Sequence, residues 1–256
     1  MSGRIPQSSL ALDPELLLRA YSVGVFPMAD SRDAPSVYWV EPKTRAILPL
    51  DAFHLSKSLR KTLLSDRYAT TANRDFAGIV RLCAESVDNR PDTWINAQIE
   101  SAVQVLHRHG HAHSIETWED GKLVGGLYGI SLGRAFFGES MVSRATDASK
   151  VALAHLVARL RVGGFTLLDC QFMTDHLASL GAVEVSRTAY MALLEGAVAG
   201  AVSAGGASEA PGSPPDFDAL DLLPDAPDAP DASPVNVTVS GPISAWRIVH
   251  SLVHTS

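Results

Sequence analysis

Segments with the apolar spacing of strands and of helices alternate along residues 68–180, and this alternation constrains the fold most. Short runs rich in β-branched and aromatic residues predict strands, and apolar residues three or four apart predict helices. The expected strands span 68–72, 113–118, 122–130, 134–139 and 166–169, and the expected helices span 76–85, 95–109, 148–162 and 175–180. Helices of this length between strands pack onto a sheet. The sequence therefore predicts a mixed α/β (α+β) fold.

The first sixty residues have a different pattern and predict a smaller α/β unit. Asp13 and Pro14 precede an apolar run that ends at Tyr21. Aspartate is favoured as the cap of a helix and proline at its first position, so this run should form a helix. Short β-type stretches follow it. We expect a small N-terminal domain over 1–60 and a larger domain over 61–198.

Residues 199–234 interrupt the pattern and predict a disordered linker. They hold seven of the fifteen prolines and many small residues, which supply too little apolar area to offset the entropy lost on ordering. Apolar residues recur at helical spacing after residue 242. We therefore expect residues 235–256 to pack back onto the body.

The distribution of charge bears on possible partners. The formal net charge is −7, but seven of the 28 acidic residues lie in 209–231, and the remaining 21 balance the 21 lysines and arginines. The body is therefore neutral, and one stretch of it is basic. This stretch could contact nucleic-acid phosphates, or it could be a solvated helix face. Its basic residues are Lys57, Arg60, Lys61, Arg67 and Arg74.

Other features predict a globular, cytoplasmic protein without a metal or cofactor. No apolar run approaches the about 18 residues of a membrane span, and we expect no signal segment before Asp13. The two cysteines, Cys83 and Cys170, lack the C-x-x-C spacing of metal or redox sites. A metal or disulfide framework is therefore not expected.

A polar pair stands at the end of the expected strand at 166–169. Asp169 and Gln171 are two positions apart, so their side chains should emerge on the same face where the strand ends. Open α/β sheets bind ligands at that edge. The pair is a candidate site, although Asp169 could instead cap a helix or pair with a basic residue.

Glu139 is a third candidate. It stands between a glycine and a serine at the end of the expected strand at 134–139 and should be half buried. A buried carboxylate needs a partner. That partner could be a substrate, or Arg144 or Lys150 in a structural ion pair.

Several motifs occur in an order that is hard to obtain by chance. They include Gly24-Val-Phe-Pro27, Asn73-Arg-Asp-Phe76, Thr93-Trp-Ile95, Gly110-His-Ala-His-Ser-Ile-Glu116, Gly138-Glu-Ser-Met141, Asp169-Cys-Gln171 and Leu180-Gly-Ala182. In this wording and order, residues 12–194 resemble the leucyl/phenylalanyl-tRNA–protein transferase family. The resemblance implies an acetyltransferase-like (GNAT-type) fold for the larger domain.

The same resemblance implies an aminoacyltransferase and its partners. Such an enzyme moves Leu or Phe, and Met less well, from aminoacyl-tRNA to the N-terminal Arg or Lys of acceptor proteins, which marks them for the N-degron pathway of protein degradation. It would act as a monomer without a cofactor. Asp169 and Gln171 match the family's proposed catalytic pair, and Glu139 matches a contact to the substrate. The basic stretch would then contact the tRNA backbone.

The resemblance also implies two binding regions. Trp94 matches a position where an aromatic ring stacks on the 3′-terminal adenosine, and Met28 stands where many members carry Trp, with Tyr38 or Trp39 as alternative contacts. The positions that match an apolar pocket for the Leu or Phe side chain are Leu127, Phe136, Met141, Leu156, Leu160 and Leu168. An N-acetyltransferase of the same fold and a non-catalytic tRNA-binding module are the alternative functions.

Overall fold

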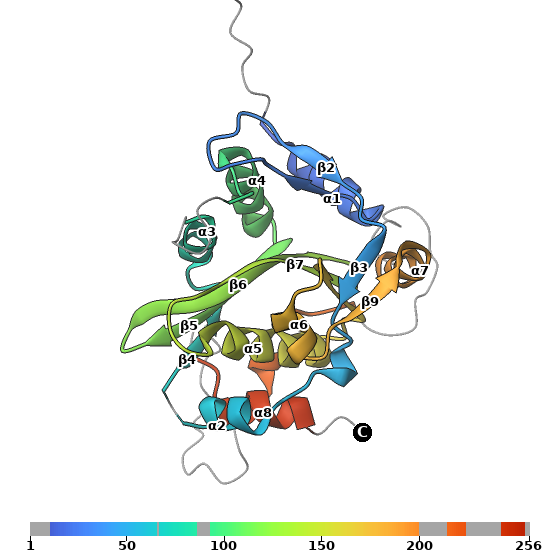
Figure 1. Cartoon of the computed structure of the whole chain (residues 1–256). Helices are drawn as coiled ribbons and strands as arrows, with labels where there is room; N and C mark the ends of the chain where they lie inside the picture. The colour runs from blue at the N-terminus through green and yellow to red at the C-terminus, as the bar shows by residue number, and fades with distance from the viewer. Residues whose placement is uncertain (1–10, 66, 86–92, 200–213, 224–241, 254–256) are drawn as a thin grey trace, which may run out of the picture.

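A large sheet forms the centre of the molecule (Figure 1). The computed structural model describes residues 11–65, 67–85, 93–199, 214–223 and 242–253. Seven strands pair in the order β4-β5-β6-β7-β8-β3-β9; β7 and β8 run parallel, and the other described pairs run antiparallel. The strands are β3 (Thr44–Ile47), β4 (Ala69–Ala72), β5 (Ala112–Glu119), β6 (Lys122–Leu132), β7 (Ala135–Ser143), β8 (Leu167–Gln171) and β9 (Val183–Ser186).

Helices cover both faces of this sheet. α5 (Ala148–Val162) connects β7 to β8 and packs on one face, because parallel neighbours need a crossover connection. α3 (Phe76–Ala84) and α4 (Ala97–Arg108) lie on the other face (Figure 1). The remaining helical segments are α2 (Lys57–Leu63), α6 (Asp175–Ser179), α7 (Arg187–Val198), α8 (Ala245–Val253), η1 (Leu50–Ala52) and η2 (Ala219–Leu222).

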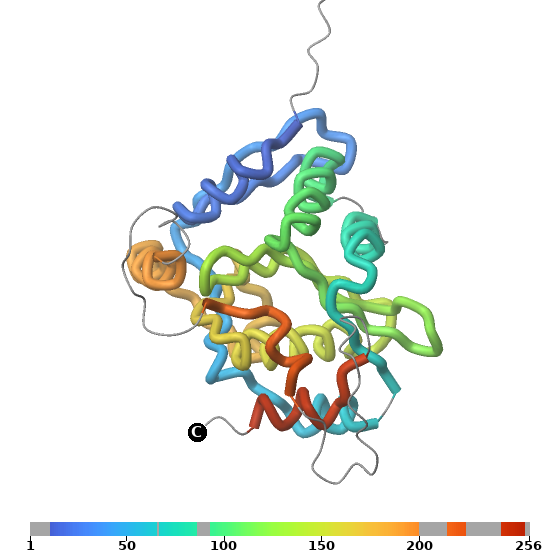
Figure 2. The backbone as a smooth tube through the Cα atoms, turned by 180° about the vertical axis from the view of Figure 1, so that it is seen from behind, coloured from blue at the N-terminus to red at the C-terminus, as the bar shows by residue number. Residues whose placement is uncertain are grey.

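α5 is enclosed on almost every side. It contacts the sheet on one side and η2 and α8 on another, and α8 in turn lies beside α2 (Figure 2). A helix with neighbours all round needs apolar residues all round. From Ala148 to Leu160 nearly every residue is buried, including the polar side chains of His155 and Arg159.

A smaller unit precedes the large sheet. It consists of α1 (Pro14–Ser22) and the antiparallel pair β1 (Phe26–Met28) and β2 (Tyr38–Val40). The expected start of α1 is confirmed, because an Asp13 side-chain oxygen accepts a hydrogen bond from the Glu15 amide at 3.0 Å and proline occupies the first turn. β3 already lies inside the seven-stranded sheet, so the chain enters the large body by residue 44, earlier than the expected boundary at residue 60.

The structure confirms the alternation of strands and helices expected for residues 68–180, and with it the mixed α/β fold. The expected and observed bounds of α5 are identical. One strand differs: β7 continues to Ser143, whereas the sequence analysis ended it at residue 139. Among the described residues, no helix is long and apolar enough to cross a membrane.

The region expected to be a disordered linker contains a packed segment. In residues 214–223, the side chains of Phe217 and Leu220 are buried against α5. The expectation of disorder is wrong for this segment because these two side chains pack against apolar residues that are distant in the sequence. The rest of 200–234 lies outside the described residues. Downstream, Ile243 donates a backbone hydrogen bond to the Thr70 carbonyl at the edge of β4 (3.0 Å), and α8 packs on α5.

Candidate active site

A cavity of about 290 Å³ lies where the small unit meets the large sheet. Its walls come from β1, from the loop before α4, from β6, β7 and β8, and from α5 and α6. Most of the lining is apolar, and the few polar groups include Glu139 and Gln171. A concave apolar site with a few convergent polar groups is the usual form of a ligand site.

Four of the six residues expected to line an apolar pocket do line this cavity: Leu127, Met141, Leu156 and Leu168. Phe136 and Leu160 do not. Both are fully buried in the core on the α5 side of the sheet, where the Phe136 ring stacks 5.8 Å from the Phe217 ring. The sequence analysis missed Leu153, which lines the cavity one turn before Leu156 on α5 and could have been found from that helical spacing.

Glu139 reaches the cavity because β7 bulges. In the pairing of β6 with β7, Tyr128 lies opposite Ser140 and Gly129 lies opposite Gly138, so Glu139 is the extra residue. A bulge turns a side chain out of the regular alternation of a strand and often occurs beside active sites. The position is therefore in the middle of β7, and not at the strand end that the sequence suggested.

Hydrogen bonds from two side chains hold the Glu139 carboxyl group. The Gln171 side-chain amide donates to its Oε1 at 3.1 Å, and the Tyr21 hydroxyl donates to the same carboxyl group. The ion pairs considered as alternatives do not form, because Arg144 binds Glu85 at 2.6 Å and Lys150 binds Asp147 at 2.8 Å.

Asp169 does not line the cavity. Its carboxylate is fully buried and pairs with Arg45, whose Nε and Nη2 approach it to between 2.6 and 3.0 Å. The Tyr190 hydroxyl donates to the same carboxylate at 2.7 Å, and the backbone N–H of Gln171 donates to it at 2.8 Å. The expectation that Asp169 and Gln171 emerge together is therefore wrong, and pairing with a basic residue, the stated alternative, is what the structure shows.

Gln171 has an unusual backbone conformation. Its φ is +57°, in the left-handed region that non-glycine residues rarely occupy. Such a conformation persists only when its surroundings enforce it. Here the Asp169 side chain accepts the hydrogen bond of the Gln171 amide, and Glu139 accepts that of its side-chain nitrogen. Because the nitrogen is used in this way, the side-chain oxygen of Gln171 remains available to a hydrogen-bond donor in the cavity.

The environment of Glu139 favours its protonated form. Burial raises the pKa of Glu139 from its ordinary value of 4.5 to about 8, and the Asp169 charge raises it further, while the hydrogen bond from Tyr21 and the Arg45 charge oppose the rise. A strongly shifted carboxyl group in a cavity is typical of a functional site. In the free protein at neutral pH, Glu139 is therefore mostly uncharged.

This shift predicts how stability depends on pH. The folded protein holds the Glu139 proton up to about pH 8 and the unfolded chain only to about pH 4.5, so stability falls as pH rises between these values. The melting temperature of the wild type should therefore fall relative to that of Glu139→Gln from pH 5 to 8, and the difference should level off above pH 8. The exposed Glu184→Gln is the control and should show no such divergence. Parallel melting curves for wild type and Glu139→Gln would contradict the shift.

Aromatic and thioether side chains form another part of the cavity lining. Trp94 and Met28 both line it, as does Phe26, whose ring lies edge-on to the ring of Phe172 at 5.7 Å. Phe172 is 47% exposed and also lines the cavity, a contact that the sequence analysis missed. The residues considered as substitutes for Met28 lie outside the lining: Tyr38 and Trp39 are exposed on β2.

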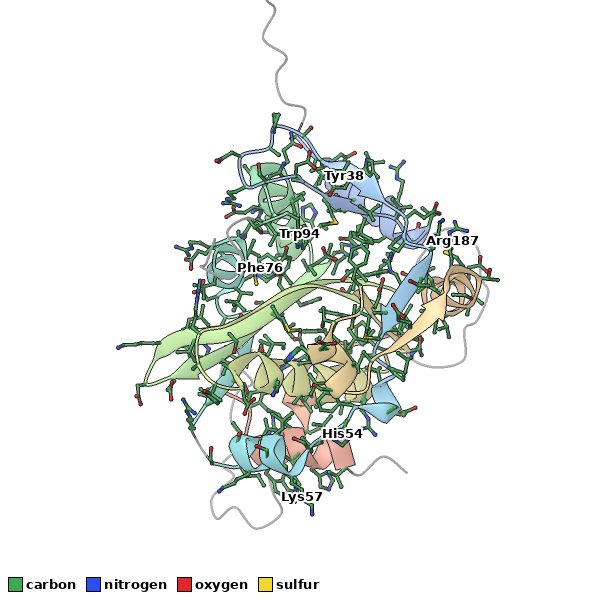
Figure 3. All side chains as sticks on the ribbon, viewed as in Figure 1. Tyr38, His54, Lys57, Phe76, Trp94 and Arg187 are labelled. Atoms are coloured by element: carbon green, nitrogen blue, oxygen red, sulfur yellow. The ribbon has the colours of Figure 1, made fainter. Side chains whose placement is uncertain are left out.

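The five basic residues of the stretch 57–74 form two separate groups. Lys57, Arg60 and Lys61 are exposed on α2, and Figure 3 shows Lys57 at the far end of the molecule from Trp94. Arg67 and Arg74 line a second hollow next to Trp118, where Arg67 also binds Glu119 at 2.7 Å. The three residues of α2 do not line that hollow.

Comparisons with known proteins identify the family. The family model of leucyl/phenylalanyl-tRNA protein transferase matches residues 47–195, and the model of its N-terminal domain matches residues 11–43. A transferase of this name from Rhizorhabdus wittichii is 64% identical over 96% of this chain and 99% of its own length. One from Zymomonas mobilis is 62% identical over 73% of this chain and 70% of its own.

A solved structure, the crystal structure of FemX, is a more distant match, with a TM-score of 0.45 and 12% identity over 67% of this chain and 66% of that one. The two family models confirm the expected arrangement, in which a small N-terminal unit precedes a larger domain. They also confirm the aminoacyltransferase activity expected from the sequence. The chain belongs to the leucyl/phenylalanyl-tRNA–protein transferase family.

Proposed function

We propose that the cavity binds the aminoacyl-adenosine end of a charged tRNA and that the ester is attacked beside Gln171. The observation that carries this proposal is the position of the Gln171 side chain. It lines the cavity together with apolar residues that include Leu127, Leu156 and Leu168 and together with Trp94 and Met28, and no residue that the structure describes donates to its oxygen. In this arrangement the amino-acid side chain enters the apolar region and the adenine stacks against Trp94 and Met28.

The apolar region suits side chains that are unbranched at Cβ, such as those of Leu, Phe and Met. Met141 adds a flexible wall that adapts to different shapes, and Leu153 and Leu156 from α5 bound the region on another side. Exclusion of Ile and Val by shape alone is worth only about 1–3 kcal/mol. We infer a preference among these amino acids and not an absolute choice.

The reaction is the aminolysis of an ester that is already activated. The enzyme has to supply proximity, a neutral attacking amine and hydrogen-bond donors for the developing oxyanion, and it needs no covalent nucleophile. A free α-amine titrates near roughly 7.7–8, so positioning its proton suffices. The Gln171 oxygen accepts a hydrogen bond from the attacking amine and orients its lone pair. An amide oxygen is too weak a base to take the proton fully.

Asp169 acts through Gln171 in this scheme. Arg45, Tyr190 and the Gln171 amide already donate to its carboxylate, so it has little capacity left to accept a proton from substrate. Its role is to hold the backbone of Gln171. We further propose, from the family resemblance, that acceptors begin with Arg or Lys and that the enzyme works as a cytoplasmic monomer.

Transfer of labelled Leu from Leu-tRNA to a protein that begins with Arg tests the proposal. Gln171→Ala should lower the transfer rate at least about tenfold, because the incoming amine loses its orienting acceptor, while the affinity for Leu-tRNA is retained. The control Gln104→Ala removes a half-buried glutamine on α4, outside the cavity, and should transfer normally. A Gln171→Ala variant with the wild-type rate would move the site elsewhere, and acetyl transfer from acetyl-CoA would favour the N-acetyltransferase alternative.

We also propose that α2 contacts the tRNA backbone. Changing Lys57, Arg60 and Lys61 together to Glu should weaken tRNA binding and flatten its salt dependence, since each lost phosphate contact lowers the log–log slope by roughly 0.7–0.9. A control with the same change in charge reverses three exposed residues elsewhere, Lys43, Arg108 and Lys122. If the α2 variant keeps the wild-type slope, the contact surface lies elsewhere, with Arg67 and Arg74 the next to test.

A further inference from the structure

The hydroxyl group of Tyr128 has no hydrogen-bond partner among the described residues. Tyr128 lies on β6, its side chain is fully buried, and it lines the cavity. Its ring packs edge-on against the ring of Phe76 at 5.9 Å. A buried polar group without a partner is costly and rare in folded proteins. A ligand bound in the cavity would supply the missing hydrogen-bond acceptor.

Four side-chain donors near Glu139 and Asp169 already have acceptors. Gln171 and Tyr21 both donate to Glu139, and Tyr190 and Arg45 both donate to Asp169. The buried hydroxyl proton of Tyr128, in contrast, has no acceptor among the described residues and is therefore available to a substrate. Ester aminolysis requires a donor at the carbonyl oxygen, where negative charge develops.

We propose that Tyr128 donates a hydrogen bond to the carbonyl oxygen of the aminoacyl ester and stabilises the oxyanion formed there. This inference rests on the proposed function of the cavity. The amine nitrogen of the acceptor attacks the carbonyl carbon, and the C=O π electrons move to the oxygen that Tyr128 contacts. When the C=O bond re-forms, the ester C–O bond breaks, its electrons stay on the ribose oxygen, and the proton lost by the amine ends there. Tyr128 keeps its own proton throughout.

Two features of the surroundings suit this role. Burial raises the pKa of Tyr128 well above its ordinary value, and the nearby Glu139 raises it further, so the hydroxyl remains a donor at neutral pH. The raised pKa of Glu139, about 8, keeps that neighbour mostly uncharged in the free protein, so it adds little repulsion to a developing oxyanion.

Tyr128→Phe tests the inference because it removes only the hydroxyl group. In single-turnover transfer of labelled Leu, we expect the variant to be at least about tenfold slower, with the dissociation constant of Leu-tRNA within about twofold of wild type. Its melting temperature should equal or exceed that of the wild type, because no hydrogen bond of the free protein is lost. Tyr68→Phe is the matched control. The Tyr68 hydroxyl donates a solvent-exposed hydrogen bond to the Thr146 carbonyl at 2.8 Å, and Tyr68 does not line the cavity. This variant should transfer Leu at the wild-type rate.

Four results would overturn the inference. If Tyr128→Phe transfers Leu at the wild-type rate while Gln171→Ala is slow, the cavity remains the site but Tyr128 is not the donor. If both variants transfer Leu at the wild-type rate, the cavity is not the site. A slow Tyr128→Phe with a clearly lowered melting temperature would assign the hydroxyl to the fold. A slow Ser140→Ala with a normal Tyr128→Phe would assign the donor to Ser140, the other hydroxyl on the adjacent strand that lines the cavity.

Discussion

Asp169→Ala is expected to lower the free energy of unfolding by about 3–5 kcal/mol and to abolish measurable transfer. Removing one partner of a buried ion pair leaves the other charge desolvated and unpaired, which costs about this much. Arg45 is 2% exposed and its guanidinium has Asp169 as its charged partner, with the Gly24 carbonyl as a further acceptor. The loss should appear as a lower urea midpoint at pH 7.

A double variant separates the stability of the pair from its role in catalysis. Replacing a buried ion pair with apolar residues of similar volume is often neutral or stabilising. Arg45→Met with Asp169→Leu should therefore recover much of the stability. Transfer should stay low, because the Gln171 backbone still lacks the acceptor that supports its φ of +57°. An Asp169→Ala variant with the urea midpoint of the wild type would contradict this account of the pair.

The comparison of Asp169 with Glu139 shows what the sequence could predict. Local spacing located both residues and the strands that carry them. It could not predict that Asp169 turns to Arg45, because that partner lies 124 residues away and on another strand. Nor could it predict the bulge that redirects Glu139, because the bulge depends on the register with β6. Both errors concern pairing between distant segments, which a local pattern does not contain.

The C-terminal region shows the same limit in a different form. Its average composition correctly marked a break from the globular pattern, but averaging hid three residues that have specific partners. Phe217 stacks on His113 at 3.9 Å, Leu220 is fully buried, and Asp221 binds the buried Arg159. The partners on β5 and α5 were predicted as parts of a strand and a helix. The need of Arg159 for a distant acid could not be predicted from the α5 segment alone.

Asp221→Ala is expected to destabilise the protein about as strongly as Asp169→Ala. The Arg159 guanidinium is 1% exposed, and it donates to the two carboxylate oxygens of Asp221 at 2.6 and 2.9 Å and to the Phe217 carbonyl at 2.7 Å. Without Asp221, most of the compensation for this buried charge is lost, a cost of about 3–5 kcal/mol. Phe217 and Leu220 would then pack less tightly against α5. Because Leu153 and Leu156 of α5 also line the cavity, transfer of Leu should weaken as well.

Asp218→Ala is the matched control for this prediction. Asp218 also approaches Arg159, but at 3.5 Å and with a side chain that is 47% exposed, so its removal should cost less than about 1 kcal/mol. Urea unfolding of both variants, read by circular dichroism, measures the difference. Equal and small losses would mean that residues 214–223 contribute little to holding α5, and a large loss only in Asp218→Ala would reverse the assignment of the buried partner. A large loss only in Asp221→Ala would show that a segment with the composition of a linker completes the core behind the cavity.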